Sequence, residues 1–291
     1  DGTTNLDVVD VDGAANFAAD VTFADGADII TASAGTSNTR VGVNAGNSIA
    51  SGGNYNVVLG DEAGTALTTA DDNVAIGFEA LKTEDEHGRN VAVGYQSLKT
   101  LNAGALAVTT TVGYKSGTSL TTGVQNTLIG GLSGDALTDA DFNVAVGNNT
   151  LTTDTKGNKS TAIGYEALAA QNFTSSTDSF NTAVGCQAGA AVTTGTENTI
   201  IGGRAGDALT DADKNVAVGS EALSADTLGS NSVAVGRAAL ANQNFTSATD
   251  TYNTAVGARA GVEVTTGVNN TLIGGLAGDA ITTGSQNTGI G

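Results

Sequence analysis

The stretch Asn181-Thr182-Ala183-Val184-Gly185-Cys186-Gln187-Ala188 carries the pattern that decides the fold. Fifteen copies of Asn-Thr/Val-Ala-Val/Ile-Gly, with substitutions, run through the chain at a spacing of 17 to 21 residues. Their glycines are Gly42, Gly60, Gly77, Gly94, Gly113, Gly130, Gly147, Gly164, Gly185, Gly202, Gly219, Gly236, Gly257, Gly274 and Gly291. A fixed period near 17 is typical of a solenoid, in which one repeat cannot bury its own face alone. We therefore predict an all-β, parallel β-solenoid of about 15 coils over residues 38–291.

The composition favours one elongated body with a narrow interior. The 291 residues include 41 Gly but no Pro, Met or Trp, and only 4% are aromatic. Val, Ile, Leu, Ala and Thr must therefore fill the core. The lone Cys186 excludes an internal disulfide framework and is expected to be a surface or half-buried thiol.

The net charge of −19 disfavours nucleic acid and anionic membranes as partners, because both attract clusters of Lys and Arg. No run of 18 apolar residues is present, so we predict no membrane insertion. The chain does not begin with Met and it ends on a motif glycine, so we expect a mature product or a fragment of a longer parent.

The motif side chains lead to a prediction of which side of each strand is buried. The second position is always Thr or Val and the fourth is always aliphatic. Because residues two apart on a strand share a face, we expect positions two and four to point into the coil. The third position would then form an exposed apolar stripe, which marks an interface between subunits unless it is only scattered surface alanine. Its largest members are Val58, Leu128, Ile200 and Leu272.

The residues around the strand suggest the rest of the coil. The motif glycine permits a turn or a close backbone approach. We expect a second short strand to begin three residues later, where the side chain is small. The leading residue is Asn in 12 of 15 copies, which suits a turn and allows a ladder of stacked amides along the solenoid.

A longer repeat of four coils lies over the short one. The residue four places after the motif glycine follows the order Gly-Gly-Leu-Leu, and the units begin near residues 56, 126, 198 and 270. Two coils carry insertions, at residues 171–180 and 243–252, whose aromatic residues are Phe173, Phe180, Phe245 and Tyr252. These rings either fold back over a coil edge or form a receptor-binding surface, since insertions in solenoids often carry binding.

Residues 1–37 lack the motif. Short alternating runs separated by Asp-Gly turns predict an N-terminal β cap or an intertwined shaft segment.

Few residues suggest chemistry. The single histidine, His87, lies in a charged stretch that we expect to be a solvated turn, and no nucleophile–base set or Cys/His metal cluster is evident, so we predict no enzyme activity. Cofactors and metals are expected to be absent, with one weak exception. Alternating oxygen side chains make Asp139, Asp141, Asp211 and Asp213 candidate calcium ligands, against the alternative of exposed turn aspartates.

The run Thr161-Ala162-Ile163-Gly164-Tyr165-Glu166-Ala167-Leu168, with its Asn-Thr-Ala-Val-Gly relatives, resembles the head repeats of trimeric autotransporter adhesins and the similar repeats of bacteriophage tail fibres. The opening Gly2-Thr3-Thr4-Asn5-Leu6-Asp7-Val8-Val9-Asp10 resembles segments of fibre-like proteins of marine phages. The adhesin resemblance implies a left-handed parallel β-roll and a homotrimer. The coils here are somewhat longer than in that family, and no coiled-coil stalk, neck or membrane anchor is evident.

These features predict a structural segment of a phage tail fibre, extracellular and on the virion surface, that takes part in host attachment. Its partners would be itself as a homotrimer, a host cell-surface glycan or protein, and other fibre or virion proteins. A bacterial surface adhesin head or extracellular filament is the alternative. Ice binding is a further alternative, which the inward direction predicted for the second-position Thr residues disfavours.

Overall fold

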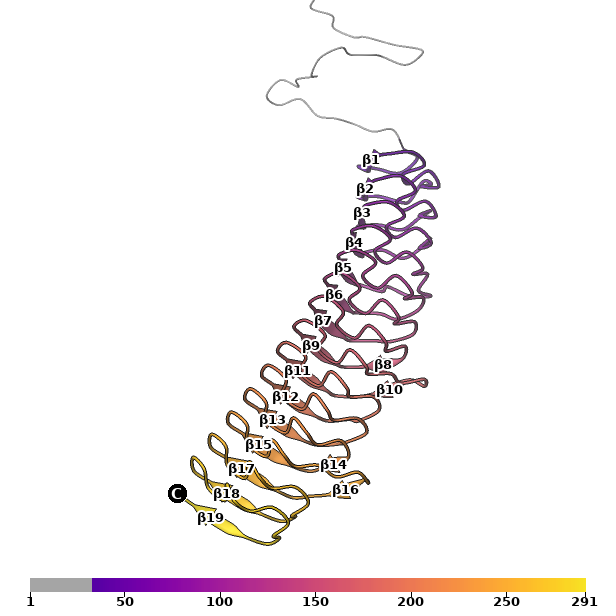
Figure 1. Cartoon of the computed structure of the whole chain (residues 1–291). Helices are drawn as coiled ribbons and strands as arrows, with labels where there is room; N and C mark the ends of the chain where they lie inside the picture. Colours follow the sequence, from indigo (N-terminus) through magenta and orange to yellow (C-terminus); the bar gives the residue numbers. More distant parts are fainter. Residues whose placement is uncertain (1–32) are drawn as a thin grey trace, which may run out of the picture. The chain divides into compact units, whose positions relative to one another are not determined.

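The computed structural model describes residues 33–291, which form one solenoid of stacked coils (Figure 1). The main sheet contains 15 parallel strands of three residues, each paired with the strand of the next coil. These strands are β1 (Thr39–Val41), β2 (Val57–Leu59), β3 (Val74–Ile76), β4 (Val91–Val93), β5 (Thr110–Val112), β6 (Thr127–Ile129), β7 (Val144–Val146), β9 (Thr161–Ile163), β11 (Thr182–Val184), β12 (Thr199–Ile201), β13 (Val216–Val218), β15 (Val233–Val235), β17 (Thr254–Val256), β18 (Thr271–Ile273) and β19 (Thr288–Ile290). The predicted all-β parallel solenoid of about 15 coils is confirmed. The cap or shaft predicted at residues 1–37 lies, up to residue 32, outside the described residues.

The register keeps equivalent motif positions in line from coil to coil. In β11 and β12, for example, Thr182 pairs with Thr199 and Val184 with Ile201. Each rank of side chains therefore runs straight along the stack, and β-branched residues suit such a pleated surface. Regular stacking of one motif thus converts a short sequence pattern into long, uniform surfaces.

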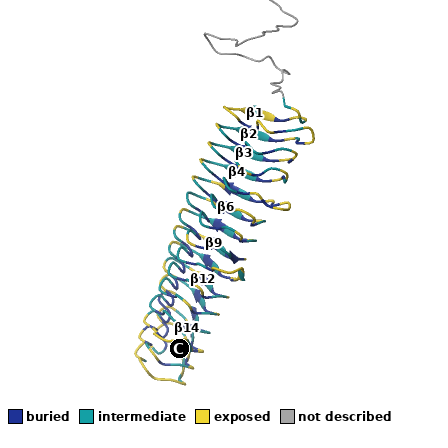
Figure 2. Ribbon diagram, turned by 90° about the vertical axis from the view of Figure 1, so that its right-hand side faces the viewer, coloured by how far each residue is buried: buried dark blue, intermediate teal, exposed yellow. Residues whose placement is uncertain are grey.

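The third motif position points into the coil, opposite to the prediction. Val58, Leu128, Ile200 and Leu272 are fully buried within the single chain, and so are the alanines that occupy this position in other coils. Burial inside one chain removes all four residues as interface candidates. Positions two and four face outward instead, as the alternation of burial along the strands shows (Figure 2).

The four-coil repeat has its physical cause in the packing of this thin core. A Cβ added at Gly134 would lie 3.0 Å from Cδ2 of Leu128 and 2.8 Å from Cδ1 of Leu137. In the coils of Ala145 and Ala162, Leu151 and Leu168 stand in place of that glycine and are fully buried. Where both positions are small, as at Ala183 and Gly189, neighbouring coils fill the space: a Cβ on Gly189 would lie 2.9 Å from Cδ1 of Ile200 and 3.1 Å from Cδ2 of Leu168. Large and small side chains therefore compensate for one another within and between coils.

A ladder of asparagine side chains lines the interior next to the strands. Oδ1 of Asn181 accepts from the backbone N of Asn198, whose own Oδ1 accepts from the backbone N of Asn215, at 2.9 and 3.0 Å. The Nδ2 group donates across the coil to a carbonyl 14 residues on, as from Asn198 to Ala212 at 2.8 Å. The ladder satisfies buried backbone donors that a three-residue strand leaves open.

The second strand expected after each motif glycine is not formed. The backbone there is a turn, and its coil-to-coil bonds include Gly189 N to the carbonyl of Ala205 at 3.0 Å. The expected close approach at the motif glycine is confirmed. At Gly185, with φ of 144°, an added Cβ would lie 2.4 Å from the carbonyl oxygen of Gly202. Because this segment is a turn and not a second strand, one coil closes in 17 residues.

The two insertions add small parallel sheets. These are β8 (Gly157–Asn158) with β10 (Thr177–Asp178), and β14 (Gly229–Ser230) with β16 (Thr249–Asp250). Beneath the first, the buried carboxylate of Asp154 accepts from Gly157 N at 3.0 Å, Phe173 N at 3.0 Å and Gln171 Nε2 at 2.6 Å. Asp226 repeats the arrangement in the next unit. This buried polar network fixes the base of each insertion.

Candidate functional site

The most extensive candidate site is the outer sheet face, which we define as the outward side chains at the second and fourth motif positions. Its fourth rank is aliphatic in all 15 strands, and its second rank holds nine Thr and six Val. Within the stack, Val112, Ile129, Ile163, Ile201, Val256 and Ile273 are each between 36% and 41% exposed. The face thus presents a continuous row of half-exposed branched side chains to solvent.

The outer sheet face is uncharged although the chain carries a net charge of −19. Fifteen strands about 4.8 Å apart, with two ranks about 7 Å apart, give an area on the order of 500 Å². Contiguous apolar patches on monomeric proteins rarely exceed a few hundred Å², and larger ones mark interaction sites. The arrangement suits an apolar protein partner.

An aromatic row borders the outer sheet face at the position directly after the motif glycine. Phe78, Tyr95 and Tyr114 stack across three successive coils, with ring centroids 5.4 Å apart in both pairs. All three rings are exposed, and Nζ of Lys115 lies 5.5 Å from the Tyr114 centroid. The row extends the apolar surface around one edge of the sheet.

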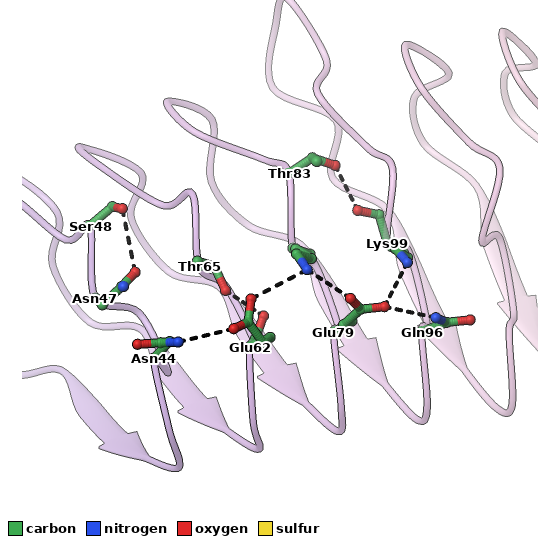
Figure 3. Close-up of polar contacts among 10 residues, drawn as sticks. Asn44, Asn47, Ser48, Glu62, Thr65, Glu79, Thr83, Gln96 and Lys99 are labelled. Carbon is green, nitrogen blue, oxygen red and sulfur yellow. Dashed lines mark hydrogen bonds and ion pairs between the residues drawn. The ribbon is translucent and has the colours of Figure 1, made fainter.

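A polar ladder occupies the next position along the same edge (Figure 3). Asn44 Nδ2 donates to Glu62 at 3.0 Å, and Lys82 Nζ bridges Glu62 and Glu79 at 3.3 and 2.7 Å. Lys99 Nζ lies 2.6 Å from Glu79, which also accepts from Gln96 Nε2 at 2.7 Å. The hydrogen bonds from Lys82, Lys99 and Gln96 lower the pKa of Glu79 from 4.5 to about 2.

We expect the Glu79→Gln variant to be less stable than the wild type by about 1 kcal/mol at pH 7, because it lacks this ion-pair network. A lowered pKa in the folded state gives stability that is present above pH 4.5 and is lost as the pH falls toward 2. Urea denaturation at pH 7 and at several values below 4.5 measures the difference. It should shrink steadily with acid, and a constant difference would contradict the assignment. Glu221→Gln is the matched control, since Glu221 has the same motif position and no ion pair within residues 33–291.

The aromatic residues of the insertions divide into two kinds. Phe173 and Phe245 are buried, at 6% and 7% exposed, so the prediction that they supply receptor-binding surface is wrong. They fold back over the coil edge, where the Phe173 ring packs beside Gly157. Phe180 and Tyr252 are 53% and 57% exposed. Nζ of Lys159 lies 5.1 Å from the Phe180 centroid, so an exposed cation accompanies that ring.

The four aspartates considered as calcium ligands bond to the preceding coil. Asp139 and Asp211 accept from the hydroxyls of Thr122 and Thr194 at 2.7 and 2.6 Å. Asp141 and Asp213 accept from backbone N groups, those of Val124 and Thr196, both at 2.7 Å. Each carboxylate therefore has a structural role between coils.

Other chemistry is sparse in the part of the chain that the structure describes. Residues 33–291 contain one group of three possible metal-binding side chains, Glu84, Asp85 and His87. Glu84 is fully buried, so the prediction of a wholly solvated turn there is wrong. Cys186 is exposed. Among residues 33–291 there is no helix long and apolar enough to cross a membrane.

Comparison with known proteins adds no relative. No family model, curated protein or solved structure matches the chain. The solenoid and its surfaces are therefore the features from which a function can be proposed. Sequence reasoning did not identify which motif positions face outward. A signal was present: in every coil with a large third-position residue, glycine stands four places after the motif glycine.

Proposed function

We propose that the chain is a structural segment of an extracellular phage tail fibre that takes part in host-surface attachment and works as a homotrimer. The single observation that carries this proposal is the uncharged outer sheet face, which continues over all 15 strands. The bacterial adhesin head or extracellular filament remains the alternative, since both use the same architecture. The resemblance to adhesin head repeats adds the expectation of left-handed coils.

A second copy of the chain is the occupant that best fits the outer sheet face. Specific protein interfaces bury about 800 Å² on each partner, and the roughly 500 Å² of this face, with the aromatic row beside it, is of the same order. Two chains that each carry a net charge of −19 meet at the lowest electrostatic cost through a face without charged side chains, and this face contains none. Three chains arranged with these faces inward would remove the second- and fourth-position side chains of all strands from solvent. The insertions would stay on the outside of the trimer.

A stack of this kind suits a spacer that holds a receptor-binding surface away from the virion. The coil-to-coil sheet, the asparagine ladder and the buried Asp154 network each link neighbouring coils by hydrogen bonds. Such repeated links make bending costly in every coil. Contacts with other fibre or virion proteins would then form at the ends of the segment.

Host contact is assigned to the exposed rings of the insertions, Phe180 and Tyr252. Aromatic side chains offer large apolar surface for a host glycan or protein at little entropic cost. The adjacent Ser, Thr and Asn residues of both insertions supply hydrogen-bonding groups. The two rings occupy equivalent positions in successive units, so the trimer would present them in a regular array.

The Phe180→Ala/Tyr252→Ala variant should lose at least about tenfold in binding to host cells, as expected for removal of central aromatic contacts. Its circular dichroism should match the wild type, because both rings are exposed. Phe142→Ala is the matched control, since Phe142 is 47% exposed and precedes a motif Asn, as Phe180 does, but lies outside the insertions. Unchanged binding by the double variant would refute the assignment of receptor contact to the insertions.

One observation favours ice binding as a second candidate. The nine Thr residues of the second motif position face outward in a regular array, contrary to the direction that had disfavoured this function. The fully aliphatic neighbouring rank supports protein association more strongly. Thermal hysteresis of the wild-type chain in solution would favour ice binding over self-association.

A further inference from the structure

The Glu84 corner, comprising Glu84, Asp85, His87, Leu101 and Ala103, departs from its counterparts in the two later units. In those units the buried Asp154 and Asp226 each accept two backbone N–H groups and one glutamine Nε2. At the Glu84 corner the glutamine is replaced by Leu101. Fully buried Glu84 keeps only the backbone donors His87 N at 3.1 Å and Ala103 N at 3.3 Å. Burial raises the pKa of this carboxyl group.

Two coupled replacements place an imidazole next to this carboxylate. His87 stands where the later units have Gly157, and Ala103 stands where they have Phe173. A Cβ on Gly157 would lie 2.2 Å from Oδ2 of Asp154 and 2.8 Å from Cδ2 of Phe173, so the carboxylate and the ring together fill the space that a side chain at that position would need. Ala103 removes the ring and leaves room for the imidazole. The corner is therefore a second, self-consistent arrangement of the same turn.

Several polar atoms at this corner have no partner. Nδ1 of His87 is shielded from solvent without a hydrogen bond and lies 3.6 Å from Oε1 of Glu84. Nδ2 of Asn73 and Asn90, both fully buried residues, is also unpaired. In other coils this amide donates to the carbonyl 14 residues on, which for Asn73 is that of His87, and this bond is not made here. Three of the four unpaired buried atoms in residues 33–291 thus belong to one corner and its ladder positions.

We propose that Glu84, Asp85 and His87 bind a divalent transition-metal ion of the Zn²⁺ class. One ligand atom from each residue lies within 4.8 Å of the other two. Ligands about 2.0–2.2 Å from a tetrahedral metal are about 3.4 Å apart, close to the separation of the Glu84 oxygen and the His87 nitrogen. An imidazole with two carboxylates suits Zn²⁺ or Mn²⁺ better than Ca²⁺, which prefers oxygen ligands alone.

The ion would take the place of the glutamine Nε2 group that contacts the buried carboxylate in the later units. It would neutralise the buried carboxylate and give Nδ1 of His87 a partner. Nδ2 of Asn73 and of Asn90 is buried without an acceptor, so each would supply a donor if an uncoordinated carboxylate oxygen of the site came within reach, as ligating carboxylates require. The Glu84–His87 turn would then be held by a metal where the Asp154 turn is held by an amide.

The test uses the whole chain with Cys186→Ser, which removes the one thiol that would also bind zinc. After EDTA treatment, calorimetric titration with ZnCl₂ should show one ion per chain. Because His87 is the single histidine, its imidazole ¹⁵N resonances report the site without ambiguity, and Nδ1 should shift on addition of one equivalent. Unshifted imidazole resonances would overturn the proposal.

Two variants and a matched control define the ligands. His87→Gln and Glu84→Gln should weaken zinc binding at least about tenfold. Glu86→Gln removes the same charge as Glu84→Gln from the same turn, but Glu86 is exposed and outside the cluster, so its affinity should stay within about threefold. Equal weakening by Glu86→Gln and His87→Gln would also overturn the proposal. If Glu84→Gln fails to fold, His87→Gln still decides, because His87 is partly exposed.

Discussion

A chain that carries Ile129→Asp and Ile201→Asp is expected to be a folded monomer. Both residues lie in the fourth rank of the outer sheet face and are 37% and 38% exposed, so a single chain can hydrate the new carboxylates. In the proposed trimer six carboxylates would be buried without partners, at a cost of several kcal/mol for each ion. Sedimentation velocity should show loss of the oligomer, while circular dichroism retains the solenoid signal.

The control for this variant adds the same charge elsewhere. Thr174→Asp and Thr246→Asp place two carboxylates on the exposed insertions, and this chain should stay oligomeric. If both pairs of substitutions dissociate the assembly equally, charge repulsion and not the outer sheet face is responsible. Leu128→Asp provides the contrast, because a carboxylate in that fully buried position should unfold the coil.

Replacing Asp154 by alanine should lower the free energy of unfolding by roughly 3–5 kcal/mol. The substitution leaves three buried donors without an acceptor, namely Gly157 N, Phe173 N and Gln171 Nε2, and each unsatisfied group costs about 1–3 kcal/mol. Urea denaturation monitored by circular dichroism measures the loss. Asp226→Ala should cost a similar amount, since its three bonds match.

Asp139→Ala serves as the control for the buried carboxylate. Asp139 is exposed and accepts only from the Thr122 hydroxyl in the described structure, so its loss should cost less than about 1 kcal/mol. A similar cost at Asp139 and Asp154 would contradict the account of the buried network.

The sequence was sufficient to predict about 15 coils with parallel strands, but not the absence of a second strand in each coil, nor which side of each strand is buried. A strand such as Thr127-Leu128-Ile129 is apolar on both sides, so alternation alone does not distinguish them. The volumes of the side chains at the third position and at the position four after the motif glycine distinguish the buried side from the exposed side. Leu128 coincides with Gly134, whereas Ala145 coincides with Leu151, and residues that compensate for one another's size meet in the same core.

The burial of the insertion aromatics and the packing of the Glu84 corner could be recognised only once the structure showed which residues of neighbouring coils lie next to one another. Phe173 and Phe180 both lie in a polar loop, and only the position of Phe173 beside Gly157 explains why one is buried and the other exposed. His87 looked like part of a solvated turn because its neighbours are charged. Its alignment with Gly157, together with that of Ala103 with Phe173, identifies the corner as an alternative packing.

The mass of the wild-type chain in solution tests the central claim most directly. Sedimentation equilibrium across the micromolar range should give three times 28.5 kDa, about 86 kDa, because three copies would cover the outer sheet faces of one another. A well-folded species that stays at 28.5 kDa over the same range would show that these faces remain in water, and would contradict the account.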